Sequence, residues 1–145
     1  MADILMDLIV KAPAARVFDA FTTPAGLDTW WTKRSRLTSK GGEGCDVELL
    51  FGPGYEWRAR YVRYEPGVGV EMKITAADRD WVGTRVGARL IHKAGTTTVR
   101  FYHKGWPARN EHWRISCYCW AAYLRIMRRN IEHGETVPYE RRLDV

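Results

Sequence analysis

The sequence predicts an α+β fold in which a curved antiparallel sheet covers one long C-terminal helix. Two observations carry this prediction. Apolar and polar residues alternate between turn residues from position 45 to position 103, which is typical of an antiparallel meander. Apolar residues then recur at helical spacing from about position 108 to position 133. A sheet with one apolar face and a helix with one apolar stripe must each bury that surface, and here they can cover each other.

The residues before the meander predict one strand and two short helices. The apolar run Asp3–Lys11 is typical of a strand that is buried on both faces or nearly so. Pro13 suits the first turn of a helix, and Pro24 ends that helix. A second short helix is then indicated by Leu27, Trp30 and Trp31.

Three turns predict the register of the meander, at residues 52–54, 66–67 and 94–95. Each turn places apolar residues opposite one another, and the resulting pairs include Leu49 with Trp57, Tyr61 with Met72 and Leu90 with Val99. All three hairpins put their apolar residues on one face, and a slip of one residue would break that agreement. The same alternation assigns to this inner face Trp57, Tyr61, Arg63, Phe101 and His103.

The final predicted element is the longest, since a helix over residues 108–133 measures roughly 35–40 Å. Its apolar stripe has alternating spacings of four and three and consists of Trp113, Cys117, Trp120, Leu124, Met127 and Ile131. Basic residues near its end and Gly134 after it are typical of a helix C-terminus. We therefore expect this stripe to lie against the inner face of the sheet.

Length and composition predict one domain over residues 1–145 with a substantial core. An odd number of cysteines, three, and the absence of a basic leader before the first apolar run favour a reducing, cytoplasmic setting. No apolar run approaches the roughly 18 residues of a membrane span. The net charge of +6 permits nucleic acid as a partner, but the predicted outer sheet face offers mainly Tyr102 for base stacking, so this partner is not favoured.

Amphipathic aromatic residues are unusually frequent, with seven Trp and seven Tyr against four Phe. Two interpretations remain open for those on the sheet and helix: an ordinary Trp-rich core, or the lining of a cavity. The inward positions of Arg63 and His103 favour a cavity, because an interior charge is costly without a partner or water. The alternative for Arg63 is a structural pair with Glu65 at the end of a strand.

No catalytic motif or metal-binding pattern emerges, so we expect no cofactor and no metal. The predicted register separates His92 from His103 by about 20 Å, too far to share a metal. Cys117 and Cys119 lie two residues apart on a helix and point to nearly opposite sides. An enzymatic activity is therefore uncertain, and non-enzymatic binding is favoured.

The chain resembles the SRPBCC superfamily, which has the START and birch-pollen-allergen-like helix-grip fold. Within it the chain looks like the branch named after the activator of the Hsp90 ATPase. The resemblance lies in the segment from Ala12-Pro13 to Thr23-Pro24, in Leu27–Trp31, in the Gly41-Gly42 region, in the Trp57-Arg58-Ala59 strand and in the terminal helix. It implies a curved sheet around the C-terminal helix, with a cavity between them that binds apolar ligands.

Three functions follow for this cavity. The first is binding of a small apolar or aromatic molecule, with Trp30 and Trp31 at the mouth and a lining of Trp57, Tyr61, Arg63, Phe101, His103, Trp113, Cys117 and Trp120. The second is a cyclase or hydrolase in the same cavity, with His103 as general acid or base. The third is protein interaction, as a homodimer or as a chaperone co-activator, and it predicts a large exposed apolar patch.

Overall fold

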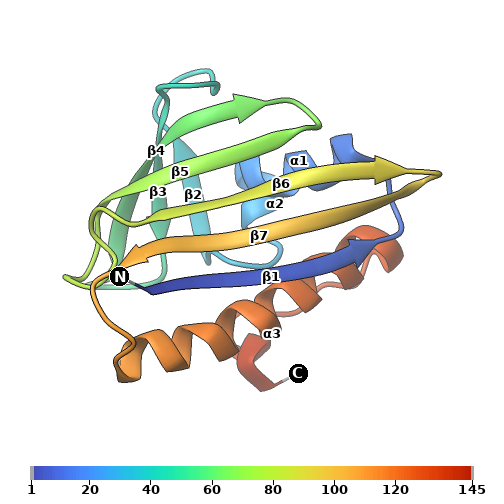
Figure 1. The fold of residues 1–145 in the computed structure, drawn as a ribbon. Coiled ribbons are helices and arrows are strands. Elements are labelled where there is room, and N and C mark those ends of the chain that lie inside the picture. The colour runs from blue at the N-terminus through green and yellow to red at the C-terminus, as the bar shows by residue number, and fades with distance from the viewer. Residues whose placement is uncertain (1, 145) are drawn as a thin grey trace.

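The structure, a computed structural model, describes residues 2–144 and is built on one seven-stranded antiparallel sheet (Figure 1). Its strands are β1 (Ala2–Val10), β2 (Arg34–Leu37), β3 (Asp46–Leu50), β4 (Glu56–Glu65), β5 (Gly69–Ala76), β6 (Arg85–Lys93) and β7 (Thr96–Trp106). The helices are α1 (Ala14–Thr22), α2 (Pro24–Leu27), α3 (Glu111–His133) and the 3₁₀ helix η1 (Tyr139–Asp144). The predicted α+β helix-grip architecture is confirmed.

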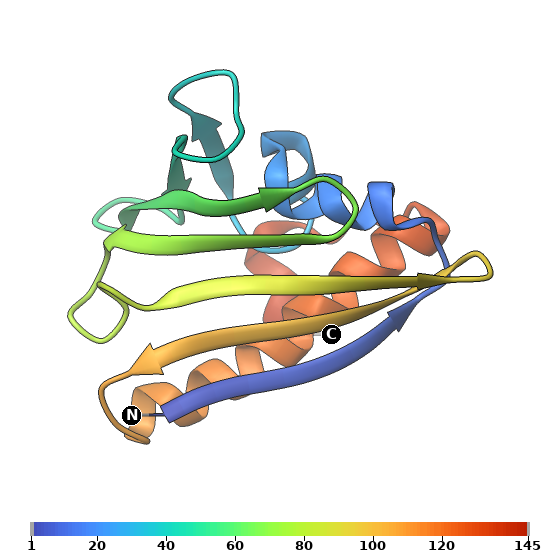
Figure 2. The ribbon, with the colours of Figure 1, turned by 45° about the horizontal axis from the view of Figure 1, so that its top comes forward.

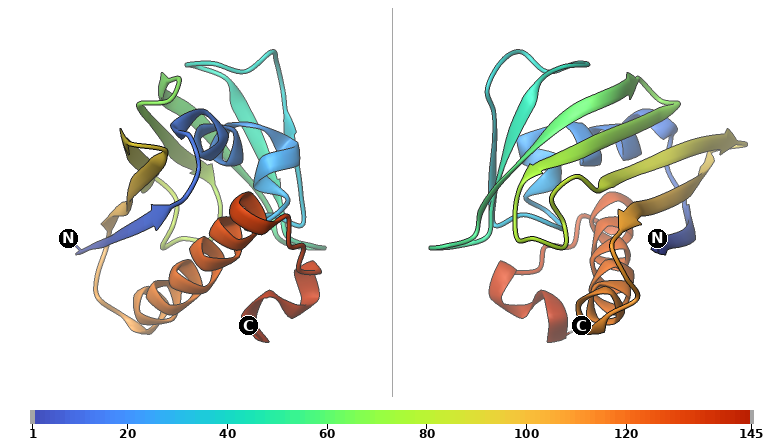
Figure 3. Two further views of the ribbon diagram at one scale, coloured as in Figure 1. Left: turned by 90° about the vertical axis from the view of Figure 1, so that its right-hand side faces the viewer. Right: turned by 60° about the vertical axis from the view of Figure 1, so that its left-hand side comes forward.

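The sheet is curved, and the helices lie on its concave side (Figures 2 and 3). The strands follow the spatial order β1-β7-β6-β5-β4-β3-β2, so the long β1 and the short β2 form the two edges. Helix α3 runs beneath the β1 side, and α1 and α2 cover the other part of the concave face (Figure 3). The hydrophobic core fills the space between these helices and the sheet.

The predicted hairpin registers are confirmed, but a bulge changes the face of one candidate residue. Leu49 pairs with Trp57 and Tyr61 pairs with Met72, as the turns predict. Between Tyr61 and Arg63 the register of β4 against β5 shifts by one residue. A bulge of this kind inverts the alternation beyond it, so the predicted inward position of Arg63 is wrong. Arg63 lies on the outer face, where its Nε donates to Glu65 Oε1 at 2.9 Å.

The first strand is buried on one face only, which corrects the prediction that it is buried on both. Ile4 and Val10 are buried, whereas Leu5 and Ile9 are 68% and 60% exposed on the outer face. The apolar run resembles a doubly covered strand, yet β1 is an edge strand, and no helix in the part of the chain that the structure describes covers the outer face of the sheet (Figure 2).

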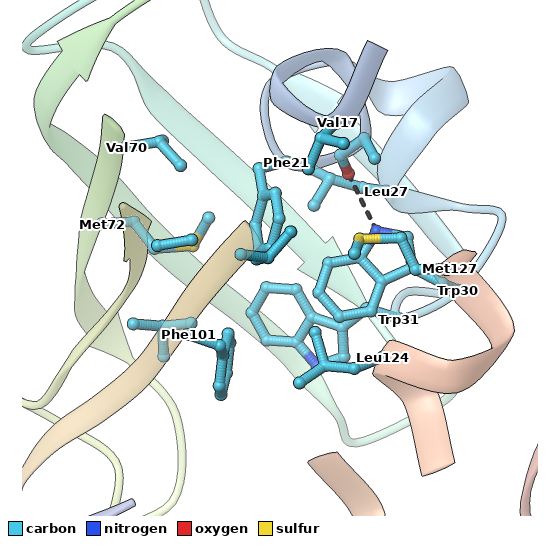
Figure 4. Close-up of a cluster of buried hydrophobic side chains, with 14 of the residues drawn as sticks. Val17, Phe21, Leu27, Trp30, Trp31, Val70, Met72, Phe101, Leu124 and Met127 are labelled. Atoms are coloured by element: carbon cyan, nitrogen blue, oxygen red, sulfur yellow. Dashed lines mark hydrogen bonds between the residues drawn. The ribbon is translucent and has the colours of Figure 1, made fainter. Parts of the chain in front are cut away.

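The carbonyl end of α1 receives two of the amphipathic aromatic side chains. Trp30 Nε1 donates to the Ala20 carbonyl at 2.9 Å, and the Tyr61 hydroxyl donates to the Phe21 carbonyl at 2.7 Å. The last carbonyls of a helix lack partners within the helix, so these bonds satisfy both sides. Figure 4 shows Trp30 and Trp31 packed among the aliphatic core residues, with the bond from Trp30 drawn. Trp30 and Tyr61 are therefore core residues whose polar tips are satisfied.

The chain after α3 returns to the body of the protein through a buried arginine. The Arg142 guanidinium donates to three backbone carbonyls, those of Val137, Thr32 and Asp28, at 3.3, 3.0 and 2.5 Å. It also lies 5.4 Å from the centre of the Tyr139 ring. These contacts hold η1 against the turn that follows α2, and they fix Tyr139 in place.

Candidate functional site

A pocket of about 360 Å³ opens where the β3–β4 turn and the loop after β5 meet the first half of α3. Its volume is within the range of small-molecule sites. The lining is dominated by aromatic side chains and consists of Trp31, Phe51, Tyr55, Trp57, Asp78, Trp81, His112, Ile115, Ser116, Cys119, Tyr123 and Tyr139.

Trp81 forms the centre of the aromatic wall. Its ring centroid lies 5.0 Å from that of Trp57, 5.7 Å from that of Trp120 and 6.4 Å from that of Trp31. The loop that carries it is closed by Asp78, whose Oδ1 accepts from the Trp81 backbone N–H at 3.2 Å. Local side-chain bonds of this type are the reason that Asp favours turns. Trp81 is thus held rigidly between the sheet and α3.

The polar end of the pocket is a histidine between two carboxylates. His112 Nδ1 lies 3.1 Å from Asp80 Oδ2, and His112 Nε2 lies 3.7 Å from Asp78 Oδ2. The imidazole also stacks on Trp81, with an interplanar angle of 24°. Asn110 caps α3 by accepting from the Trp113 N–H at 2.9 Å, which sets where the helix begins and hence where His112 stands. His112 is a titratable group that borders the pocket.

His103 is wholly buried and lies outside the lining of this pocket. Its Nδ1 accepts from Trp120 Nε1 at 3.1 Å, so its Nε2 carries the proton and donates to Thr84 Oγ1 at 2.8 Å. The Thr84 hydroxyl then donates to the Trp81 carbonyl at 2.6 Å. Burial lowers the pKa of His103 to about 3, with a smaller contribution from His112. The neutral imidazole therefore has no free nitrogen with which to contact a ligand.

Of the predicted site residues, Trp57 and Trp31 border the pocket. Four others lie in the core that supports it, and these are Trp30, Tyr61, Phe101 and Trp120. Trp113 and Cys117 lie on α3 but outside the lining. The Arg109 guanidinium lies over the Trp113 ring at 5.8 Å, and burial raises the pKa of the Cys117 thiol. Arg63, on the outer face, and His103, in the core, are likewise outside the lining.

The sequence interpretation missed the pocket because it followed the neighbouring face of the helix. His112, Ser116, Cys119 and Tyr123 have the same spacings of four, three and four as the predicted stripe, displaced by one residue. A displacement of one residue turns the helix face by about 100°. The mixed character of this second stripe, with His112 and Tyr123 beside small polar residues, was a signal that could have identified it. Asp78 and Trp81 lie in the loop between β5 and β6, and Tyr139 begins the short η1 helix, so periodicity gives no information on any of them.

Cationic side chains on the outer face are mostly paired with acids. Arg60 Nε lies 2.8 Å from Asp46 Oδ1, and Arg85 Nη1 lies 2.6 Å from Glu71 Oε2. Within residues 2–144, no group of three or more His, Cys, Asp or Glu side chains is arranged to hold a metal ion. No helix of this part of the chain has the length and hydropathy needed to cross a membrane.

Comparisons with solved structures place the fold among known proteins. The Aha1 dimer from Colwellia psychrerythraea superposes with a TM-score of 0.80 and 25% identity, covering 93% of this chain and 99% of that one. CalU16 from Micromonospora echinospora gives 0.73 and 17%, covering 98% and 81%. DynU16, a protein of the dynemicin biosynthetic locus, gives 0.72 and 20%, covering 94% and 50%.

Sequence comparisons give the family. A search of curated proteins gave no match. The family described as activator of Hsp90 ATPase homolog 1-like protein matches residues 11–132, which is most of the chain and includes β2 to β7 and nearly all of α3. The chain therefore belongs to the activator of Hsp90 ATPase homolog 1-like family, an SRPBCC-type family.

Proposed function

We propose that this protein binds a small apolar or aromatic molecule in the pocket between the sheet and α3. The observation that carries the proposal is the pocket itself, about 360 Å³ in volume and bordered by seven Trp, Tyr and Phe rings. Rings of this kind give a ligand large apolar contact at little cost in side-chain entropy. The tight core behind them supports the proposal too, because Trp81 and Trp57 are held in place before any ligand arrives.

The proposed site retains Trp57 and Trp31 from the sequence prediction and takes its remaining residues from the pocket. Tyr55 and Ile115 form its exposed rim, being 60% and 52% exposed. Tyr139 contributes from the C-terminal segment, so the site depends on Arg142, which anchors that segment.

Native mass spectrometry of protein purified from its source cells tests this proposal. We expect a small molecule to be retained by the wild-type protein and lost from an Ile115→Lys variant, because a lysine at the rim obstructs the apolar opening. The matched control is Tyr118→Lys, at a position that is 63% exposed on the same helix but outside the lining. Equal retention by both variants, or a wild-type protein without any bound molecule, would contradict the proposal.

A cyclase or hydrolase in the same pocket is the alternative. The structure favours His112 over His103 for an acid–base role, because His112 borders the pocket and Asp80 orients its ring at 3.1 Å. The two functions separate in the mass spectrometry experiment. A retained molecule that returns chemically unchanged after incubation indicates binding, and a changed one indicates turnover.

Protein interaction is a second candidate, favoured by exposed apolar residues at the β1 edge. Leu5 and Ile9 point outward on β1, and Ile91 on β6 lies across Thr98 from Ile9. The similar Aha1 structure from Colwellia psychrerythraea is described as a dimer. A homodimer through this edge predicts that Ile9→Lys lowers the sedimentation coefficient to that of a monomer. Association with a chaperone is a further proposal, tested by a pull-down with Hsp90, and a cytoplasmic location is a proposal tested by fractionation of the source cells.

A further inference from the structure

The pocket is acidic although the protein as a whole is basic. The chain has 23 Lys and Arg residues against 17 Asp and Glu residues. Even so, the described lining includes no Lys or Arg side chain, while it includes Asp78 and the imidazole of His112, whose other neighbour is Asp80. The pocket therefore carries acidic side chains on a protein whose net charge is positive.

Asp78 has one carboxylate oxygen free to meet a ligand. Its Oδ1 is occupied, accepting from the backbone N–H groups of Asp80 and Trp81 at 3.1 and 3.2 Å. Its Oδ2 lies 3.7 Å from His112 Nε2, beyond hydrogen-bond distance, and the side chain is 41% exposed. Asp80 is nearer to His112, at 3.1 Å. Two carboxylates against one imidazole leave net negative charge here even when His112 is protonated.

The other polar groups of the lining add no charge that opposes this. Burial raises the pKa of Tyr123 to about 12 and also raises the pKa of Cys119, so both stay neutral at physiological pH. The partial positive charge at the start of α3 is offset by Glu111 in its first turn. The guanidinium of Arg142 keeps its positive charge, but it lies beside Tyr139, 5.4 Å from the ring centre, and its hydrogen bonds go to backbone carbonyls rather than to Asp78 or Asp80.

Aromatic rings next to a carboxylate are a suitable environment for an organic cation. The faces of Trp and Tyr rings attract cations, and the attraction grows when the cation is removed from water. We propose that the ligand of this pocket carries a quaternary or protonated amine on an aromatic or alkyl body, with the amine beside Asp78 and the body against Trp57 and Trp81. This inference rests on the proposed function, since it names the chemical class of the ligand for the same pocket.

Two probes of equal shape and different charge test the inference. (4-Hydroxyphenyl)trimethylammonium and 4-tert-butylphenol differ in that a positive nitrogen replaces a neutral carbon. In isothermal titrations at physiological ionic strength, we expect the cation to bind about tenfold more tightly. In Asp78→Asn, whose amide oxygen can still accept the two backbone N–H bonds of the turn, the affinity for the cation falls about fivefold, and the affinity for the neutral probe is unchanged.

The control variant is Asp7→Asn, which changes net charge equally but lies on the outer face beside Arg100. It leaves both affinities unchanged. If the neutral probe binds as tightly as the cation, or if Asp7→Asn weakens the cation as much as Asp78→Asn does, the inference is overturned and binding in the pocket stands. If neither probe binds up to its solubility limit, the inference and the proposed function are both overturned.

Discussion

At the scale of single residues, three of the amphipathic aromatic side chains have their polar tips satisfied inside the core. Trp30 and Tyr61 donate to carbonyls at the end of α1, and Trp120 donates to His103. A buried polar group that is fully paired costs little, so these residues belong to the core. One such network links Trp120, His103, Thr84 and the Trp81 carbonyl, and it joins α3 to the loop that carries the central tryptophan of the pocket.

The buried neutral state of His103 predicts a pH-dependent stability. In the unfolded chain this imidazole has a pKa near 6.5, whereas in the folded protein its pKa is lowered to about 3. Between these values the unfolded state binds the extra proton, so stability falls as pH falls from about 6.5 towards 3. We expect a loss of about 2 kcal/mol from this residue between pH 7 and pH 5, measured by urea denaturation at each pH.

The pH effect is isolated by comparing two variants. His103→Gln retains a donor and an acceptor but cannot titrate, so we expect it to lose about 2 kcal/mol less than the wild-type protein over this pH range. His92→Gln, at an exposed position on β6, should lose as much as the wild type. An unchanged pH dependence in His103→Gln would show that the buried imidazole is not its source.

At the scale of elements, the segment after α3 is a structural part of the pocket. Its η1 helix has few apolar anchors, and the guanidinium of Arg142 replaces them by bonding to carbonyls on both sides of the junction. Tyr139, three positions before Arg142 in η1, borders the pocket, and its ring lies against this guanidinium.

Arg142→Met is expected to reduce the free energy of unfolding by about 2–3 kcal/mol, because it leaves buried carbonyls without donors. Urea denaturation measures this loss, and Arg141→Met, at the exposed neighbouring position, is the control, with a change within about 0.5 kcal/mol. Arg142→Met should also weaken ligand binding, because it releases Tyr139 from its position in the pocket. Equal stability of the two variants would refute the anchoring role.

At the scale of the whole molecule, the sequence was sufficient for the architecture and insufficient for the pocket. Alternation and turn residues predicted the pairs Leu49–Trp57 and Tyr61–Met72, because a register error would have exposed a whole apolar face. The bulge before Arg63 left no such signature, since residues on both of its sides remain plausible strand residues. One residue of slippage there was enough to move a charged side chain to the other face of the sheet.

The pocket escaped prediction for a different physical reason. Its walls combine a turn, a loop, a helix face and the C-terminal segment, and only folding brings Tyr55, Trp81 and Tyr139 together. The sequence did indicate that Trp57 and Trp31 were important, and both border the pocket. The predicted aromatic cluster is thus largely a core, with the pocket at one end of it.

The seven indole N–H groups allow the most direct test of ligand binding in this pocket. In a two-dimensional NMR titration with 4-tert-butylphenol, the account predicts saturable shifts of the indole signals of Trp31, Trp57 and Trp81, which border the pocket. The signals of Trp30, in the core, and Trp113, on α3 outside the lining, should remain in place. A saturable shift confined to Trp113, or no saturable shift at Trp57, would contradict it.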